Sequence, residues 1–396
     1  MSYRKLKIGY FALEALNSLA TSYYFFYLFF FMATEYGFTN RDNLAMAALN
    51  GFVYMLNAWL GGRFGQRYGY FSALSLGVGV MAASLAVGAF LHNQWGHIVV
   101  MVVCTLGMCF TWPNLEALVS ERESPHELPR TLGLYNMVWA GAGALAFFAG
   151  GALLESLGPR SLFWLPVGIQ LSQLLLLAWL SKKLKFTVLV PPDQALSHAP
   201  RLPLNPRPIA RAKTFLQMAW VANPFAYIAV NTVVAVVPGI AKSFDLTPTL
   251  AGVFCSVWFF GRLATFLALW LWDGWHYRFR WFISAYLLLV AGFAALLLGS
   301  KLSTIIVAQV AFGMGLGLIY YSSLFYSMDA GEAKAEHGGL HESAIGAGIF
   351  GGPAIAGSAL YLYPASPQSG TVAVAAVLMI GFLSLLVMRY RSRGSY

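Results

Sequence analysis

Twelve apolar stretches of about twenty residues each dominate this 396-residue sequence and limit what it can fold into. About twenty helical residues span the hydrocarbon core of a bilayer, so each stretch predicts one membrane-spanning helix. The predicted spans are residues 8–33, 43–60, 71–91, 97–120, 130–154, 161–180, 214–237, 249–272, 280–299, 303–327, 340–362 and 370–388. Only 10% of the residues are charged, against roughly 25% in soluble domains. The sequence therefore predicts an all-α membrane protein with twelve transmembrane helices.

Lysine and arginine alternate between the two sides of these predicted spans. Twenty of the 25 fall in one set of connecting segments, and Arg262 lies inside a span. The other set holds four: Arg41, Arg160, Lys242 and Lys301. Because cytoplasmic segments carry the basic excess in membrane proteins, both termini are expected in the cytoplasm. The net charge of +10 then follows from topology and predicts no nucleic-acid partner.

The first and second parts of the chain resemble each other. The stretch "WPNLEALVSERESPHELPRTLGLYNMVWAGAG" has a counterpart about 206 residues later in "YYSSLFYSMDAGEAKAEHGGLHESAIGAG", and Gln66 and Asp273 are 207 residues apart. Such an offset predicts a duplicated set of six helices. Between the copies lies the Pro-rich, basic segment 181–213. We expect two pseudo-symmetric six-helix bundles, residues 1–180 and 214–396, joined by a cytoplasmic linker over 181–213.

The segment "GGRFGQRYGY", residues 61–70, allows two interpretations. A glycine-rich, arginine-bearing loop can hold a phosphate when a short strand precedes it and a helix follows it. The segments on both sides are instead apolar over about twenty residues, the length of a membrane span. The pattern therefore favours a tight turn between two membrane helices over a nucleotide site.

This segment, the twelve spans and the central inner linker resemble the major facilitator superfamily. The family signature Gly-x-x-x-Asp-Arg/Lys-x-Gly-Arg/Lys is matched by Gly62, Arg67 and Gly69, whereas Gln66 replaces the acid and Tyr70 replaces the last basic residue. The resemblance implies that this loop is an inner latch and that helices 1, 4, 7 and 10 line a central path. With Gln66 in the acidic position, we expect the latch to depend on hydrogen bonds. Asp273 keeps the acid in the second copy.

A second family signature has an unusual position here. The series Gly348-x-x-x-Gly352-Pro353-x-x-x-Gly357 is similar to an antiporter signature of the family, but it falls in helix 11, whereas the family places it in helix 5. Close packing of small residues between helices is the favoured interpretation.

Ionisable side chains inside spans are costly in hydrocarbon and therefore indicate functional positions. In the first span, Glu14, Asn17, Thr21 and Tyr24 follow at spacings of three or four residues, which places them on one helical face. This polar face is expected to line a water-filled path. Glu14 is a candidate proton carrier, but a structural carboxylate bonded to a neighbouring helix is the favoured interpretation.

Arg262 lies near the middle of the eighth predicted span, with no acidic residue within one helical turn. A buried guanidinium needs an anionic partner. That partner is either an anionic substrate or a carboxylate from another helix, with Glu14 among the candidates. Some organic-anion carriers of the superfamily also have a Gly-Arg pair in helix 8, although here the arginine lies eleven residues before Asp273, a turn deeper than usual. Both partners therefore stay open, and a structural carboxylate is the favoured one.

Further candidates fall into two sets. Charged residues near the inner helix ends are expected to act in gating rather than in substrate contact: Glu116, His341 and Glu342. Amide and tyrosine side chains recur on several spans and favour a polar solute, with packing between helices as the alternative for each one: Asn50, Tyr54, Asn57, Asn223, Tyr227, Asn231, Tyr320 and Tyr321.

These features predict a secondary transporter that moves a small polar, possibly anionic, organic solute by alternating access, coupled to protons in symport. The alternative within this class is efflux of lipophilic or drug-like compounds; a membrane-embedded enzyme or a transport-inactive sensor is a remote one. No ATPase motif is visible, and no cofactor is expected. No metal site is expected either, since Cys104, Cys109 and Cys255 all lie within spans and their spacing matches no metal site. The expected home is the inner (plasma) membrane of a bacterium, because no organellar targeting segment is visible. A monomer is expected to suffice.

Overall fold

The structure is a computed structural model that describes the chain except for residues 1–2, 122, 124–126, 188–208, 331–333 and 394–396. Its described residues form helices and no strand. Among the described residues, eleven helical segments are long and apolar enough to cross a membrane. The 34-residue α1 (Tyr3–Tyr36) is not among the eleven, although it is long enough to cross a membrane and contains Glu14, Asn17 and several tyrosines. The chain is an integral membrane protein, and its number of candidate spans is close to the twelve predicted from the sequence.

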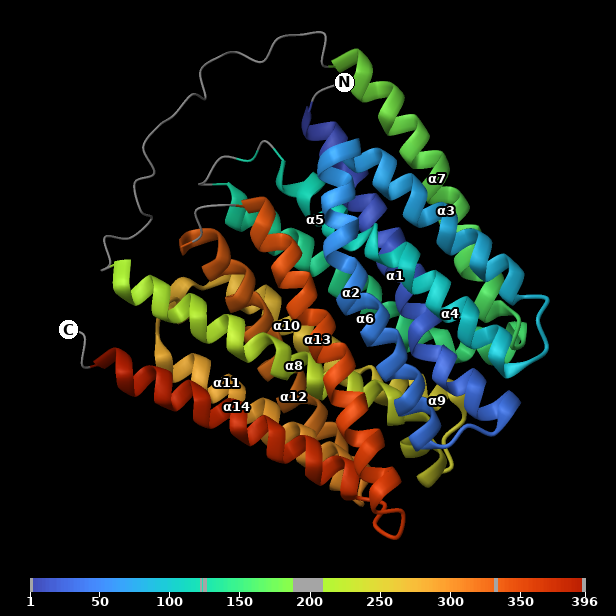
Figure 1. Cartoon of the computed structure of the whole chain (residues 1–396), viewed down its shortest axis with the longest axis vertical. Coiled ribbons are helices and arrows are strands. Elements are labelled where there is room, and N and C mark those ends of the chain that lie inside the picture. Colours follow the sequence, from blue (N-terminus) through green and yellow to red (C-terminus); the bar gives the residue numbers. More distant parts are fainter. Residues whose placement is uncertain (1–2, 122, 124–126, 188–208, 331–333, 394–396) are drawn as a thin grey trace.

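Two bundles of helices lie side by side (Figure 1). The N-terminal bundle, blue to green, consists of α1, α2 (Asn40–Tyr68), α3 (Tyr70–Gly88), α4 (Gln94–Cys109), α5 (Trp112–Ser120), α6 (Leu128–Leu157) and α7 (Ser161–Thr187). The C-terminal bundle, yellow-green to red, consists of α8 (Ile209–Ser243), α9 (Pro248–Cys255), α10 (Val257–Leu271), the 3-10 helix η2 (Asp273–Trp275), α11 (Phe279–Leu298), α12 (Leu302–Ala330), α13 (Lys334–Leu362) and α14 (Ser369–Arg393). The fourth predicted span appears as the pair α4 and α5, and the eighth as α9 and α10.

Residues 61–70 differ from the predicted loop. The helix α2 continues through most of this segment to Tyr68, and α3 begins at Tyr70. The whole turn is therefore made by Gly69, whose φ of 92° is accessible to glycine at little cost. Similarly, α7 and α8 extend into the predicted 181–213 linker from both ends, to Thr187 and from Ile209. The exact domain boundaries remain a prediction.

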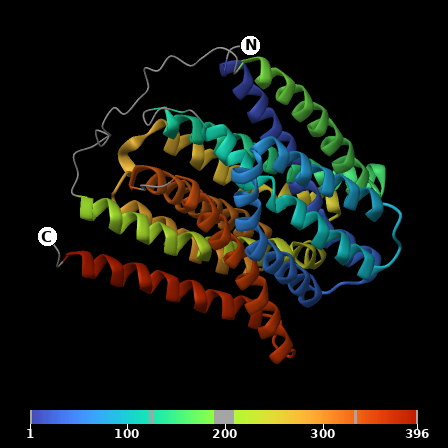
Figure 2. The same cartoon turned by 45° about the horizontal axis from the view of Figure 1, so that its top comes forward.

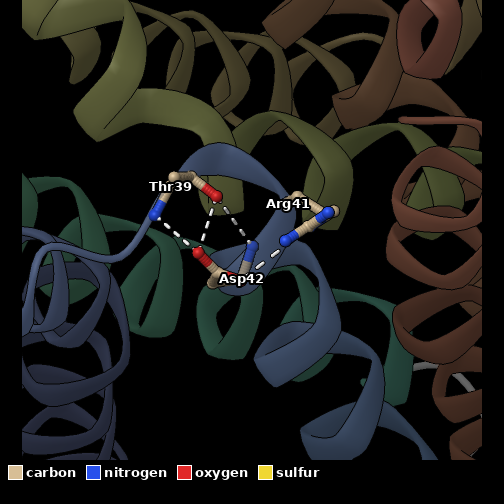
Figure 3. A network of polar contacts seen from close by, with 3 residues as sticks. All are labelled: Thr39, Arg41 and Asp42. Carbon is tan, nitrogen blue, oxygen red and sulfur yellow. Dashed lines mark hydrogen bonds and ion pairs between the residues drawn. The ribbon is translucent and has the colours of Figure 1, made fainter. Parts of the chain in front are cut away.

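At its other end, α2 begins with a capping box (Figure 3). The Asp42 backbone N–H donates to Thr39 Oγ1 at 3.4 Å, and the Thr39 backbone N–H donates to Asp42 Oδ2 at 2.9 Å. These bonds satisfy backbone donors that a helix start leaves without partners. They fix the entry of α2 on the side of the molecule opposite the chain termini.

Two seams join the bundles. In the first, α2 packs along α13, and both views show the two helices crossing side by side (Figure 1, Figure 2). In the second, α6 packs against α9 and α10. Small residues permit the close approach: a methyl group at Gly51 would lie 2.3 Å from the Phe350 backbone nitrogen. We call these the α2–α13 seam and the α6–α10 seam.

Candidate functional site

Arg262 lies in the α6–α10 seam, buried within a cluster of aromatic rings. Its guanidinium carbon is 4.1 Å from the ring centre of Trp139, 5.4 Å from that of Tyr320 and 5.6 Å from that of Phe266. Trp139 belongs to α6 of the other bundle, and its indole N–H donates to Asn136 Oδ1 at 3.0 Å. Contacts of this kind stabilise a cation through the negative ring faces.

Among the described residues, Arg262 has no carboxylate partner. The ion pairs found there are Lys7 with Glu123 and Arg41 with neighbouring Asp42. Only 5% of the Arg262 surface is exposed, and its Nε–H finds no acceptor. The Tyr227 hydroxyl lies close enough to interact with the guanidinium, but it carries no full charge. Glu14, one of the partners predicted for Arg262, does not pair with it in the structure.

Three glutamates gather at a second pole, contributed by both bundles. Glu14 of α1 is fully buried, and its Oε1 accepts a 2.7 Å hydrogen bond from Ser18, while its Oε2 has no partner. In the α2–α13 seam, the Tyr54 hydroxyl donates to Glu342 Oε2 at 2.5 Å. Glu116 of α5 is only partly buried by surface area.

The three carboxylates are near one another. Glu14 interacts electrostatically with Glu342, and Glu116 interacts with both. Tyr135 of α6 lies close enough to Glu14 for its hydroxyl to interact with the carboxylate. We call Glu14, Glu116 and Glu342 the acidic pole. Mutual repulsion and burial are costly for three negative charges, and none of the three forms an ion pair with another described residue.

Tyr227 of α8 and Tyr320 of α12 connect Arg262 to the acidic pole. Each interacts electrostatically with Arg262 and also with Glu116 and Glu342. Their rings are 6.3 Å apart, and Tyr227 is partly exposed. The arrangement thus has a cationic pole, an acidic pole and two tyrosines between them; we call it the central site.

The other predicted binding residues lie in several environments. On α1, Asn17 is buried with both amide atoms unpaired, and Thr21 donates to the Asn17 carbonyl at 2.7 Å. Tyr24 packs against Phe163 of α7, with ring centres 6.1 Å apart. The polar face of α1 therefore divides, with Glu14 near the acidic pole and Tyr24 against α7.

The remaining amides and Tyr321 differ in their contacts. Asn57 donates to the Val53 carbonyl at 2.8 Å, and Asn231 donates to the Tyr227 carbonyl at 3.0 Å. Asn223 is buried with no partner for either amide atom, and Tyr321 packs edge-on against Trp275 with ring centres 5.7 Å apart. Their part in binding remains a prediction.

The predicted latch at the end of α2 packs against α5. Asn114 Nδ2 donates to the Gly61 carbonyl at 3.1 Å, and Gly65 leaves room for the Asn114 amide, because a methyl group there would overlap it. Gly62, Gln66, Arg67 and Gly69 lie on the same helix end. Asp273 is exposed at the start of η2. The side chain of His341 is outside the described residues.

A hollow lies between α11 and α12, and none of the central-site residues lines it. Its volume is about 460 Å³, and small or apolar residues such as Gly292, Ser303 and Val307 line it. It contains no charged group that could recognise a polar solute.

Trp139, Tyr135, Ser18 and Phe266 were not expected at the site. Their sequence neighbourhoods give no signal, because aromatic and small residues occur throughout the spans. Only the packing of α6 against α10 shows that the Trp139 ring meets Arg262.

The matching of the sequence to known families agrees with this architecture. The pattern of the family described as Major Facilitator Superfamily matches residues 10–353, most of the chain. The chain belongs to the Major Facilitator Superfamily. No curated protein matches it in a sequence search.

Solved structures of this superfamily share its fold. The crystal structure of a point mutant of the nucleoside transporter NupG aligns with a TM-score of 0.64 at 12% identity, covering 99% of this chain and 100% of that one. The crystal structure of the human organic anion transporter MFSD10 (TETRAN) aligns with a TM-score of 0.68 at 16% identity, covering 97% and 100%. The family fold predicted from the sequence is confirmed, and the chain is a membrane transporter by family.

Proposed function

We propose that this superfamily member moves a small polar organic solute with an anionic group, coupled to protons, by alternating access at the central site. Arg262 holds the anionic group, Tyr227 and Tyr320 contact the body of the solute, and the acidic pole binds the coupling protons. One monomer suffices, with both termini in the cytoplasm of a bacterium and the chain in its inner membrane.

The environment of Arg262 carries this proposal. A guanidinium is charged at every physiological pH, and burying it without an anion is expensive. Aromatic rings offset part of that cost but leave the Nε–H donor free. A planar fork of donors matches a carboxylate or phosphate, so a solute anion can complete the site.

The acidic pole supports proton coupling. Protonation removes the charge repulsion among the three carboxylates and changes the hydrogen bonding of Glu342 to Tyr54. This bond joins the two bundles, which must separate on one side in each transport step. Proton binding is thereby linked to the contact between bundles.

A thermal-shift screen of the detergent-purified protein tests the solute class. It compares organic anions, neutral sugars or polyols, and lipophilic cations at mildly acidic and neutral pH. A ligand at 100 times its Kd stabilises by about 2.7 kcal/mol, which is measurable. We expect stabilisation by an organic anion that is lost in Arg262→Ala.

Arg280→Ala is the matched control, because Arg280 is an exposed arginine stacked on Trp281 at 5.5 Å. Stabilisation by neutral or cationic ligands that survives Arg262→Ala would contradict an anion site. It would favour the alternative of lipophilic efflux.

A further inference from the structure

One carboxylate oxygen of Glu14 would stay without a hydrogen-bond donor if the solute carried only an anionic group. The Glu14 carboxylate is fully buried, with one oxygen bonded to Ser18 and the other, Oε2, without a partner. One turn along α1, the Asn17 amide is also fully buried, and neither its oxygen nor its nitrogen has a hydrogen-bond partner. Residues three apart on a helix have Cβ atoms about 5–6 Å apart, so one donor group can bond both. Two buried acceptor oxygens, one of Glu14 and one of Asn17, therefore lack a hydrogen-bond donor.

We propose that the transported solute is a zwitterion, whose ammonium group is bound by Glu14 and Asn17 while its anionic group is bound by Arg262. The inference rests on the proposed function and narrows its substrate class. An ammonium has three N–H donors and no acceptor, which complements a carboxylate oxygen and an amide oxygen. The solute then fills both poles of the central site.

The position of the tyrosines fits a solute that bridges the poles. Arg262 interacts with Tyr227 and Tyr320, and none of the three glutamates is among its electrostatic partners. The same tyrosines interact with Glu116 and Glu342, and Glu116 interacts with Glu14. A molecule lying along the two rings thus extends from the guanidinium towards the acidic pole, and its anionic group supplies the partner that Arg262 lacks among the described residues.

The three carboxylates then have separate roles. Glu342 is held by Tyr54 across the α2–α13 seam and, with Glu116, keeps the coupling protons. Glu14 accepts the ammonium. A metal ion is a poorer occupant, since no group of three or more His, Cys, Asp or Glu side chains in the described part of the chain is arranged to hold one.

The test uses the full chain in detergent and a series of ω-aminocarboxylates, from glycine to aminooctanoate. Each is paired with the carboxylate of equal length that lacks the amine. Binding is measured by thermal shift and by calorimetry. A charge-assisted hydrogen bond predicts that the fitting aminocarboxylate binds about tenfold or more tightly than its amine-free pair.

The variants assign the effect to its residue. Glu14→Gln keeps the shape of the side chain and should remove the advantage of the amine, whereas Glu35→Gln, at an exposed glutamate on the same helix, should keep it. Asn17→Ala should reduce the advantage, and it tests the same contact if Glu14→Gln does not fold. Arg262→Lys should weaken both members of a pair.

Each contrary result has a distinct meaning. If carboxylates bind equally with and without the amine, or if the amine advantage persists in Glu14→Gln, the zwitterion assignment is wrong and the anion site at Arg262 stands. If no member of the series binds, or if binding ignores Arg262→Lys, the inference and the proposed function both fail.

Discussion

The Arg262 guanidinium lies 4.1 Å from the ring centre of Trp139 and thereby joins the two bundles at the α6–α10 seam. Across the molecule, Tyr54 and Glu342 join them at the α2–α13 seam through a 2.5 Å hydrogen bond. Each seam thus pairs one charged residue of the C-terminal bundle with one aromatic residue of the N-terminal bundle. The groups proposed to bind solute and protons are therefore also contacts between the two bundles.

Replacing the Trp139 ring tests the first contact. Trp139→Ala removes the cation–π contact with a buried arginine and should lower stability by about 2 kcal/mol or more, because cavity formation adds to the lost contact. Trp139→Phe keeps a ring face and should cost less. The melting temperature in detergent measures both, with Trp281→Ala beneath the exposed Arg280 as the control. Equal melting temperatures for Trp139→Ala and Trp281→Ala would argue against the contact.

Removing one hydroxyl tests the second contact. Tyr54→Phe leaves the Glu342 carboxylate without its donor, which should cost about 1–3 kcal/mol in stability at neutral pH. Tyr68→Phe, at an exposed tyrosine near the end of the same helix, should be neutral. Thermal unfolding at neutral pH compares them, and an unchanged melting temperature in Tyr54→Phe would contradict the seam role of this bond.

A third contact between the bundles lies on the side opposite the termini. Glu155, near the end of α6, accepts a 3.2 Å hydrogen bond from the Thr249 backbone N–H at the start of α9, and its other oxygen accepts from Thr249 Oγ1. Negative charge at a helix N-terminus is stabilising. The group is exposed, so a double-mutant cycle of Glu155→Gln and Thr249→Val should give a coupling energy of only about 0.5–1 kcal/mol. Additive effects of the two changes would show that the bond contributes nothing to the closure of this side.

Backbone contact in the α2–α13 seam predicts a strict requirement at Gly51. Gly51→Ala places a methyl group against the Phe350 backbone, which cannot rotate away, and should destabilise by about 1–3 kcal/mol. Gly79→Ala, in helix α3 with open space around the new methyl group, should be neutral or stabilise by up to about 1 kcal/mol. Thermal unfolding of the two variants, each with one added methyl group, separates seam packing from helix propensity. A tolerated Gly51→Ala would show that the seam is looser than described.

The sequence predicted the helices well because hydrophobic length and charge alternation are local properties. It also singled out Glu14 and Arg262, since an ionisable side chain inside an apolar span is visible without any structure. It missed the helical course of residues 61–68, because glycine and arginine there resemble a loop, although the glycines serve the packing of α2 against α4 and α5.

The grouping of the site residues could not be read from the sequence. Glu14 and Glu342 lie more than 300 positions apart, and only the packing of α1, α5 and α13 brings their carboxylates near each other. For the same reason, the sequence predicted Glu116 and Glu342 only as gating charges and did not show that they lie close to Glu14. The sequence left two possible partners for Arg262, a substrate anion or a carboxylate from another helix. None of the described carboxylates pairs with Arg262 in the structure, which leaves the substrate anion as the proposed partner.

Proton movement driven by an anion gradient tests the central claim most directly. The protein is reconstituted into liposomes that contain a pH-sensitive dye, and the anion identified in the binding screen is added outside without an imposed pH gradient. Symport predicts that inward movement of the anion acidifies the lumen, at a rate that falls to that of empty liposomes in Arg262→Ala and stays high in Arg280→Ala. Anion entry without acidification, or equal acidification in Arg262→Ala, would contradict the account.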